Sequence, residues 1–264
     1  MALRMSFGRL AAACLAAVAA DAGAAGGDPP PQGDESLLVQ RFLSRDEAPL
    51  ATYRARRILR AENDRFNARG QIEVVTELRP DGSLAFEIVH EDGSGYIRNK
   101  VLRKVLRDEA DLRRRGDAAR GGLTPANYVF SDDPAPAGGE RRVLIRPRRK
   151  DVMLVDGAIV LSHDGDLVRV EGRLAKNPSF WTRRVHVVRR YARIGGVRVP
   201  VSTESVADVR FAGRSRFEMV YLYETINGRP VAHEAVPMRA AWQVETLDRS
   251  DGVPEALFEH VPVP

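Results

Sequence analysis

The chain has 264 residues, and 44 % of them are apolar, which is enough for one large domain with a packed core. Lysine and arginine outnumber aspartate and glutamate by 41 to 36, but both signs are interspersed along the chain, and aromatic residues make up only 6 %. Nucleic acids are bound by basic surfaces and by stacking on aromatic side chains, so this composition argues against nucleic acid as a partner.

The first 25 residues have the pattern of a secretory signal peptide. Arg4 and Arg9 mark a charged start, the run from Leu10 to Ala20 is apolar, and small residues follow it. A membrane-spanning helix needs about 20 apolar residues, and Asp21 ends this run well short of that length. We therefore expect residues 1–25 to be a cleaved signal peptide and the mature protein to be exported. An uncleaved anchor is the less favoured alternative.

Cys14 is the only cysteine, and it lies inside this apolar run. Lipid attachment to Cys14 is an alternative, but Ala11 stands where such sites usually carry a leucine. We favour cleavage after Ala24 or Ala25, which leaves a mature chain without cysteine. Disulfides and thiolate metal sites are then excluded.

The rest of the chain divides into a short linker and one domain. Residues 26–34 are polar and rich in proline and glycine, which is typical of a flexible linker. We expect residues 35–264 to form a single domain. Asp34 is predicted to cap a short amphipathic helix, because apolar residues recur behind it at helical spacing. These residues are Leu37, Leu38, Phe42 and Leu43.

From residue 51 onward, apolar and polar residues alternate with the period of a β-strand. Strands are predicted over residues 72–78 and 84–88, joined by a hairpin turn at Asp81-Gly82. Asp156-Gly157 and Asp164-Gly165 are predicted to mark turns between later strands in the same way.

The second half of the chain alternates over longer stretches. Strands are predicted over 184–194 and 197–211, joined by Gly195-Gly196, a pair suited to a turn that requires positive φ. On the second strand every second residue, from Val197 to Phe211, lies on one face. After a turn at residues 212–214, Phe217, Met219, Tyr221 and Tyr223 again share one face, and Asn227-Gly228 ends that strand.

These connections determine the fold class. Two-residue turns join antiparallel neighbours only, so we expect a meander of about nine to eleven strands. A sheet of this size, with one buried and one wet face, tends to curl. The predicted fold is mainly β, a curved antiparallel meander forming an unclosed β-barrel covered by a few helices.

One segment, at about residues 95–116, has helical rather than strand periodicity. Its apolar stripe includes Val101, Leu102 and Val105, and its other face includes Arg103 and Arg107. A basic amphipathic helix of this kind either lies on an anionic membrane or packs its apolar stripe on the sheet and leaves its basic face in water. We favour the second interpretation, in which the helix covers the open face of the sheet.

No motif indicates catalysis, a metal or a cofactor. The histidines show no H-x-x-x-H spacing, and no G-x-S-x-G elbow, phosphate loop or dinucleotide fingerprint occurs. His163-Asp164-Gly165-Asp166 offers oxygens for a cation, but it is too short for a calcium loop, and a turn is favoured. We therefore expect a protein that is not an enzyme.

The loop at residues 176–181 is unusual because it places Phe180 and Trp181 beside a proline, between two strands. An aromatic pair of this kind contacts a membrane, forms the lip of a cavity or plugs the end of the sheet. The plug is the favoured alternative.

Two stretches resemble a known superfamily. Asp166 to Gly172 (DLVRVEG), and Arg193 to Pro200 (RIGGVRVP) with Thr203-Glu204-Ser205 after it, are similar to hairpins of the periplasmic lipoprotein carriers and receptors LolA and LolB, which include the regulator RseB. The long arginine-rich helix is a departure from that family.

This resemblance implies an unclosed barrel with an apolar concave side lidded by helices, and a lipid or lipidated protein as the partner. The expected function is that of a periplasmic carrier or binding protein for acyl chains, with peripheral membrane contact. The alternative is an envelope protein-interaction or regulatory module without a lipid ligand. The candidate contact residues are Phe180, Trp181, Val101, Val105, Leu102, Arg103, Arg107, Tyr221 and Tyr223.

Overall fold

A computed structural model describes residues 37–133 and 141–232 of the chain. The predicted signal peptide, the linker and the Asp34 cap lie outside the described residues, as does the C-terminal part of the predicted domain. All described strands and helices belong to one compact unit that ends at Val231.

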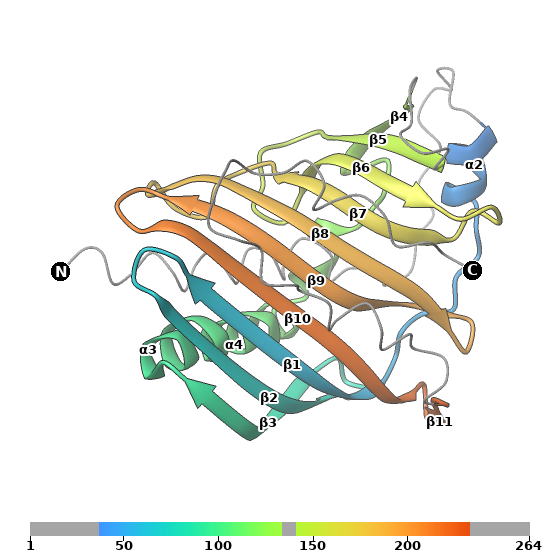
Figure 1. Ribbon diagram of the computed structural model, residues 1–264. Helices are drawn as coiled ribbons and strands as arrows, with labels where there is room; N and C mark the ends of the chain where they lie inside the picture. Colours follow the sequence, from blue (N-terminus) through green and yellow to red (C-terminus); the bar gives the residue numbers. More distant parts are fainter. Residues whose placement is uncertain (1–36, 134–140, 233–264) are drawn as a thin grey trace. The chain divides into compact units, whose positions relative to one another are not determined.

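The unit is built on one antiparallel sheet of 11 strands (Figure 1). The strands are β1 (Tyr53–Asn63), β2 (Ala68–Leu78), β3 (Leu84–Gly93), β4 (Tyr128–Asp132), β5 (Arg141–Pro147), β6 (Val155–Leu161), β7 (Leu167–Leu174), β8 (Thr182–Ile194), β9 (Val197–Val209), β10 (Gly213–Ile226) and β11 (Arg229–Pro230). Their order is β3-β2-β1-β10-β9-β8-β7-β6-β5-β4, with the short β11 paired to β10.

This order confirms the mainly β, antiparallel and unclosed fold. Consecutive strands pair with each other except β3 and β4, and β1 also pairs with β10 along its full length. The chain therefore builds three strands outward to the edge at β3, crosses to the other edge at β4 and returns strand by strand to β1. The two edges do not pair with each other, so the sheet stays open.

A helical segment makes that crossing. It consists of α3 (Gly95–Ile97), a π-helical turn η2 (Arg98–Leu102) and α4 (Arg103–Arg114), and a 3-10 turn η3 (Asp117–Gly121) follows it. In Figure 1 the segment lies behind β1, β2 and β10, and it contacts β1, β2 and β3. We call the face of the sheet that it covers the inner face. The helix predicted at about 95–116 is confirmed.

Glycines determine where the segment begins and ends. Gly93 has a φ of 80°, and a Cβ there would lie 2.5 Å from the Arg69 carbonyl oxygen, so only glycine fits. A Cβ on Gly70 would come within 3.0 Å of Ile97, which shows how closely the first turn packs on β2. At the other end, Gly116 adopts the left-handed conformation that commonly follows the last turn of a helix.

The remaining helix is α2 (Leu37–Leu43), which precedes the sheet and buries Val39 and Phe42. The Phe42 ring packs against Phe130 of β4, with 6.3 Å between ring centroids. Leu37, which was predicted on the apolar face of this helix, is 78 % exposed instead. No helix within 37–133 or 141–232 is long and apolar enough to span a bilayer.

Two predicted strand boundaries are wrong. Gly157 does not mark a turn but lies within β6, directly opposite Gly172, where a Cβ would be 2.6 Å from the Gly172 Cα atom. The pair lets the two strands approach closely. Phe211 does not continue the buried face of β9, because the strand ends at Val209 and Phe211 has a positive φ of 63° in the following turn.

The turn predicted at residues 212–214 lies at residues 210–212, because β10 already begins at Gly213. The other predicted turns are confirmed. Gly82, Gly165, Gly195, Gly196 and Gly228 all have positive φ and lie in the connections between strands.

Candidate functional site

A row of buried side chains crosses the inner face of the sheet. Directly paired residues of antiparallel strands place their side chains on the same face, and the register joins one such row from β5 to β2. Its members are Val143, Ile159, Val170, Arg189, Thr203, Met219, Leu59 and Ile72. All are buried, so the row carries one fully enclosed charge, Arg189, within an otherwise largely apolar line.

A second buried charge, Arg57, lies on the same face of β1, two residues from Leu59. Arg57 is fully buried, and its Nη2 atom donates to Oε2 of Glu109 on α4 at 2.7 Å. Its guanidinium also lies over the Tyr221 ring, 4.7 Å from the centroid. Burial alone would lower the pKa of Arg57, but the Glu109 carboxylate beside it raises that pKa above its ordinary value. Arg57 therefore stays charged, and its contact with Glu109 joins α4 to the sheet.

Tyrosines surround these charges. The rings of Tyr221 and Tyr223 are stacked with 5.8 Å between centroids, and Tyr53 packs edge-on against Tyr223 at 5.6 Å. The Tyr223 hydroxyl donates to the Pro200 carbonyl oxygen at 2.9 Å. Burial raises the pKa of Tyr53 to about 12, and it raises the pKa values of Tyr221 and Tyr223 as well. The interior beneath α4 is thus aromatic and charged.

The candidate residues on the helical segment divide between the two sides of the segment. Val101, Leu102 and Val105 are buried against the sheet, as the favoured interpretation expects. Arg103 is not a free basic contact, because its Nη1 lies 2.7 Å from Glu91 of β3. Arg107 is exposed on the outer side.

The segment also contains an irregularity beside the site. The Arg103 amide donates to the Arg98 carbonyl oxygen, five residues back, which makes the π-helical turn η2. Such turns cost some stability and are found most often at functional sites.

The candidate loop residues Phe180 and Trp181 lie elsewhere, at one end of the sheet. Phe180 is 79 % exposed, which contradicts the favoured prediction that it plugs the sheet. The Trp181 ring lies between Phe180 and Phe211, at 5.5 and 5.9 Å between centroids. The Arg210 guanidinium lies over the Phe180 ring at 5.4 Å. The prediction of a plug fails because the loop packs on the β9–β10 turn and not over the inner face.

Three neighbouring turns at this end carry exposed aromatic residues, and we call them the aromatic tip. They are residues 64–67, 175–181 and 210–212, and their exposed rings are Phe66, Phe180 and Phe211. Backbone bonds join them, from the Asp64 amide to the Arg214 carbonyl and from the Arg210 amide to the Trp181 carbonyl. Exposed basic residues surround the rings, namely Arg65, Lys176, Arg183, Arg184 and Arg210.

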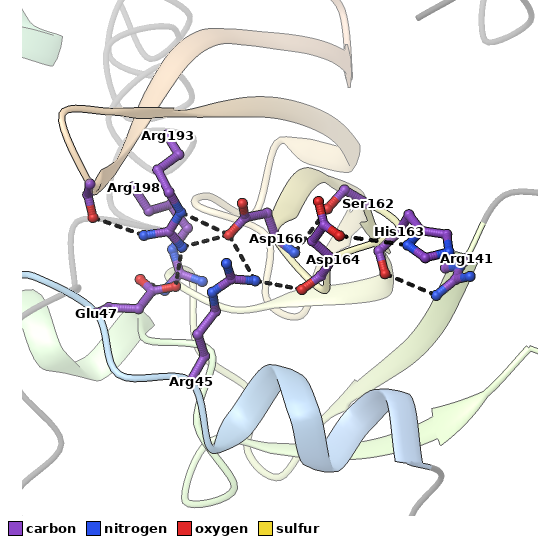
Figure 2. A network of polar contacts seen from close by, with 10 residues as sticks. Arg45, Glu47, Arg141, Ser162, His163, Asp164, Asp166, Arg193 and Arg198 are labelled. Carbon is purple, nitrogen blue, oxygen red and sulfur yellow. Dashed lines mark hydrogen bonds and ion pairs between the residues drawn. The ribbon is translucent and has the colours of Figure 1, made fainter.

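A polar network at the opposite end of β8 occupies the predicted cation motif (Figure 2). Asp166 accepts from Nη2 of Arg193 at 2.6 Å and pairs with Arg45 at 3.2 Å. Glu47 bridges Arg193 and Arg198. The hydrogen bond from Arg193 holds the pKa of Asp166 below its ordinary value. The Asp166 carboxylate is thus already paired with arginines and not available to a cation. Residues 163–166 form the favoured turn, in which the Gly165 amide donates to the Ser162 carbonyl oxygen.

This network joins the two stretches that carry the family resemblance, because Asp166 directly precedes β7 and Arg193 is the last residue but one of β8. It also attaches the segment after α2 to the sheet. Its role is therefore structural, and the described residues hold no cluster of three or more His, Cys, Asp or Glu side chains suited to a metal.

Sequence reasoning missed Arg57, Glu109 and Arg189, although a signal was present. Each is a charged residue at a position where the alternation or the helical stripe demands an apolar one. Arg57 follows Tyr53 and Ala55 on the buried face of β1, and Arg189 follows Val185 and Val187 on β8.

Comparison with known proteins adds no assignment to this geometry: no family model matches the chain, and no curated protein matches it significantly.

Proposed function

We propose that the protein binds a lipid, or the acyl chains of a lipidated protein, on the inner face of its sheet, as a carrier of the periplasm related to the lipoprotein-sorting proteins. The observation that carries this proposal is the helical segment that crosses from one edge of the open sheet to the other and packs on that face at β1, β2 and β3.

The strand pairing is compatible with entry of a ligand. The two sheet edges do not pair, and the cover is one helical segment joined to β1 by the Arg57–Glu109 ion pair. The segment can therefore move without breaking the strand ladder. Burial of an acyl chain contributes about 0.8 kcal/mol per CH₂, which is enough to repack the apolar stripe of Val101, Leu102 and Val105 around a ligand.

Native mass spectrometry of the protein purified from the periplasm without detergent tests this function. The expected result is a bound species of lipid mass that is lost on denaturation. A mass equal to that of the bare chain, in several preparations and after incubation with a lipid extract, would contradict the proposal. It would favour the alternative, an envelope protein-interaction module using the outer basic side of α4 around Arg107.

Delivery to a membrane is the second part of the proposal, and the aromatic tip supports it. Aromatic rings flanked by arginine and lysine are suited to the interface of an anionic bilayer, where the rings enter the head-group region and the cations pair with phosphates. Phe180 and Phe211 are the most exposed rings among the described residues.

Flotation with liposomes tests this second part. The protein should float with phosphatidylglycerol-containing vesicles and less with pure phosphatidylcholine. Replacing Phe180 or Phe211 by Ser should weaken vesicle binding by about tenfold each, because burying a phenylalanine contributes about 1.5–3 kcal/mol. Val129→Ser is the control, since Val129 is 46 % exposed but lies on β4. Equal flotation of all variants would contradict a role for the tip.

A further inference from the structure

Arg189 and Thr203 form a pair of buried, unsatisfied polar side chains at the centre of the inner face. They are direct cross-strand partners on β8 and β9. Arg189 is 4 % exposed and Thr203 is 0 % exposed. The Nε and Nη1 atoms of Arg189 and the Oγ1 atom of Thr203 are buried without a hydrogen-bond partner. Native proteins rarely leave buried donors unpaired, so each of these atoms requires an explanation.

Among the described residues Arg189 also forms no ion pair of its own, and the buried Glu109 carboxylate acts on its charge only from a distance. Two buried carboxylates occur among the described residues, Glu109 and Asp151. Glu109 pairs with Arg57, and Asp151 pairs with Arg120 and Arg149. The Arg189 guanidinium lies over the Tyr191 ring, 5.6 Å from its centroid. A buried charge without a partner is strongly unfavourable, so the inner face carries one positive charge in excess.

The second arginine extends this donor-rich region. Nη2 of Arg57 approaches the Met219 Sδ atom at 2.8 Å, and Met219 is the cross-strand partner of Thr203. The Nε and Nη1 atoms of Arg57 are also buried without hydrogen-bond partners. Both guanidinium groups therefore present unpaired N–H donors on the same face of β8–β10 and β1, where Glu109 is the one buried carboxylate that the described residues place beside them.

We propose that Arg189 and Thr203, with Arg57 nearby, bind the anionic group of the ligand, a carboxylate or a phosphate. This inference rests on the proposed function and specifies the head of the ligand. The same cross-sheet row continues from Arg189 through Val170, Ile159 and Val143, so an anion held at Arg189 places an attached tail beside apolar side chains. Charge-assisted hydrogen bonds from arginine to carboxylate or phosphate are among the strongest in proteins.

The test compares three probes by calorimetric titration of the full mature protein: dodecanoate, dodecanol with the same chain and no charge, and inorganic phosphate with no chain. Three variants accompany the wild type. Arg189→Met removes the charge, and Thr203→Val removes the hydroxyl at equal volume. Arg190→Met is the matched control, because Arg190 is the next residue of β8, faces outward and pairs with Glu204.

The wild type should bind dodecanoate at least about tenfold more tightly than dodecanol, the factor that corresponds to one charged hydrogen bond. This preference should vanish in Arg189→Met, shrink in Thr203→Val and persist in Arg190→Met. If Arg189→Met fails to fold, a reduced preference in Thr203→Val still supports the site and an unchanged one overturns it.

The other outcomes separate the two proposals. Equal wild-type affinity for dodecanoate and dodecanol would overturn the anion site and leave the lipid-binding function standing. Binding of inorganic phosphate alone, dependent on Arg189, would keep the anion site, identify a free anion as the ligand and contradict the lipid function. Binding of none of the three probes would contradict both.

Discussion

The two halves of the inner face are made of similar antiparallel strands but are held together differently. In the half formed by β5, β6 and β7, the buried residues are aliphatic, with Val143, Ile159 and Val170 in one line. In the half formed by β1, β8, β9 and β10, the same line of positions meets Arg189 and lies beside Arg57, which reaches Glu109 of α4. One half has the composition of an ordinary core, and the other contains charges that an ordinary core excludes.

This difference indicates where to look for function. Aliphatic packing tolerates small changes and needs no partner outside the chain. A buried charge is strongly unfavourable unless it is paired. In the described part of the charged half, Glu109 pairs with Arg57 and no carboxylate pairs with Arg189. Sequences depart from the rules of core design mainly at functional sites, so the charged half, covered by α4, is where we place the ligand.

The largest effect is expected from Arg57→Met, which leaves the Glu109 carboxylate buried and unpaired. The free energy of unfolding should fall by about 3–5 kcal/mol, measured by urea denaturation. The double variant Arg57→Met with Glu109→Gln should recover most of the loss, because it removes both charges. A loss below about 1 kcal/mol in the single variant would show that the pair is solvated and that the two halves do not differ in this way.

In the aliphatic half, Ile159→Ala should lower the free energy of unfolding by about 3 kcal/mol, within the usual range for deleting a buried isoleucine side chain. Ile159 is 0 % exposed. The conservative Ile159→Val should cost only about 1 kcal/mol. A negligible effect of Ile159→Ala would mean that this half is loosely packed and accommodates ligand without a cost.

Alkaline pH should unfold the protein through its buried tyrosines, which include Tyr53 on β1 and Tyr128 on β4. Burial raises the pKa of Tyr53 and of Tyr128 to about 12, whereas the unfolded chain has a tyrosine pKa of about 10. Because the folded-state pKa is the higher one, the stability from each neutral tyrosine is fully present below pH ~10 and is lost as the pH rises through the folded pKa. Each of these two tyrosines should contribute on the order of 2 kcal/mol.

The measurement for this prediction is tyrosinate absorbance followed together with circular dichroism. Both signals should change in one cooperative step between pH ~10 and the folded pKa of about 12. Absorbance that rises near the ordinary pKa while the circular dichroism stays constant would show that these rings are open to solvent.

The smallest effect on stability is expected from Arg189→Met, and its sign is the sharpest contrast with Arg57→Met. Removing a buried charge that has no partner should leave the free energy of unfolding of the ligand-free protein unchanged or raise it by about 1 kcal/mol or more. A loss as large as that of Arg57→Met would reveal a counter-ion for Arg189 within the protein, and the excess charge would not exist.

Much of the fold could be predicted because its determinants are local. The alternation of Val197, Val199 and Thr203 indicates a strand, and Gly195-Gly196 fixes its antiparallel neighbour. The pairing of β1 with β10 could not be predicted, because turn chemistry joins only sequence neighbours and strands β2 to β9 lie between these two in the chain. The alternation continues past Val209 and therefore predicts Phe211 on the strand. Phe211 instead adopts the left-handed conformation in a turn, which is uncommon for a residue other than glycine or asparagine and has no signal in the sequence.

The site was predictable only in part, for a related reason. Val101, Leu102, Val105, Tyr221 and Tyr223 follow their periodic patterns and are buried as expected. The charged residues interrupt those patterns, so a reading based on periodicity passes over them. Their partnership depends on α4 lying over β1, and only the three-dimensional arrangement brings Glu109 to Arg57.

Photocrosslinking with a diazirine-bearing fatty acid tests most directly whether the ligand lies on the inner face. After illumination and proteolysis, mass spectrometry should locate the crosslinks in β5–β8, around Val143, Ile159 and Val170, and in the helical segment around Val101 to Leu106. The yield should drop in Arg189→Met and not in Arg190→Met. Crosslinks confined to the aromatic tip or to the outer face of the sheet, or no crosslinks at all, would contradict the account.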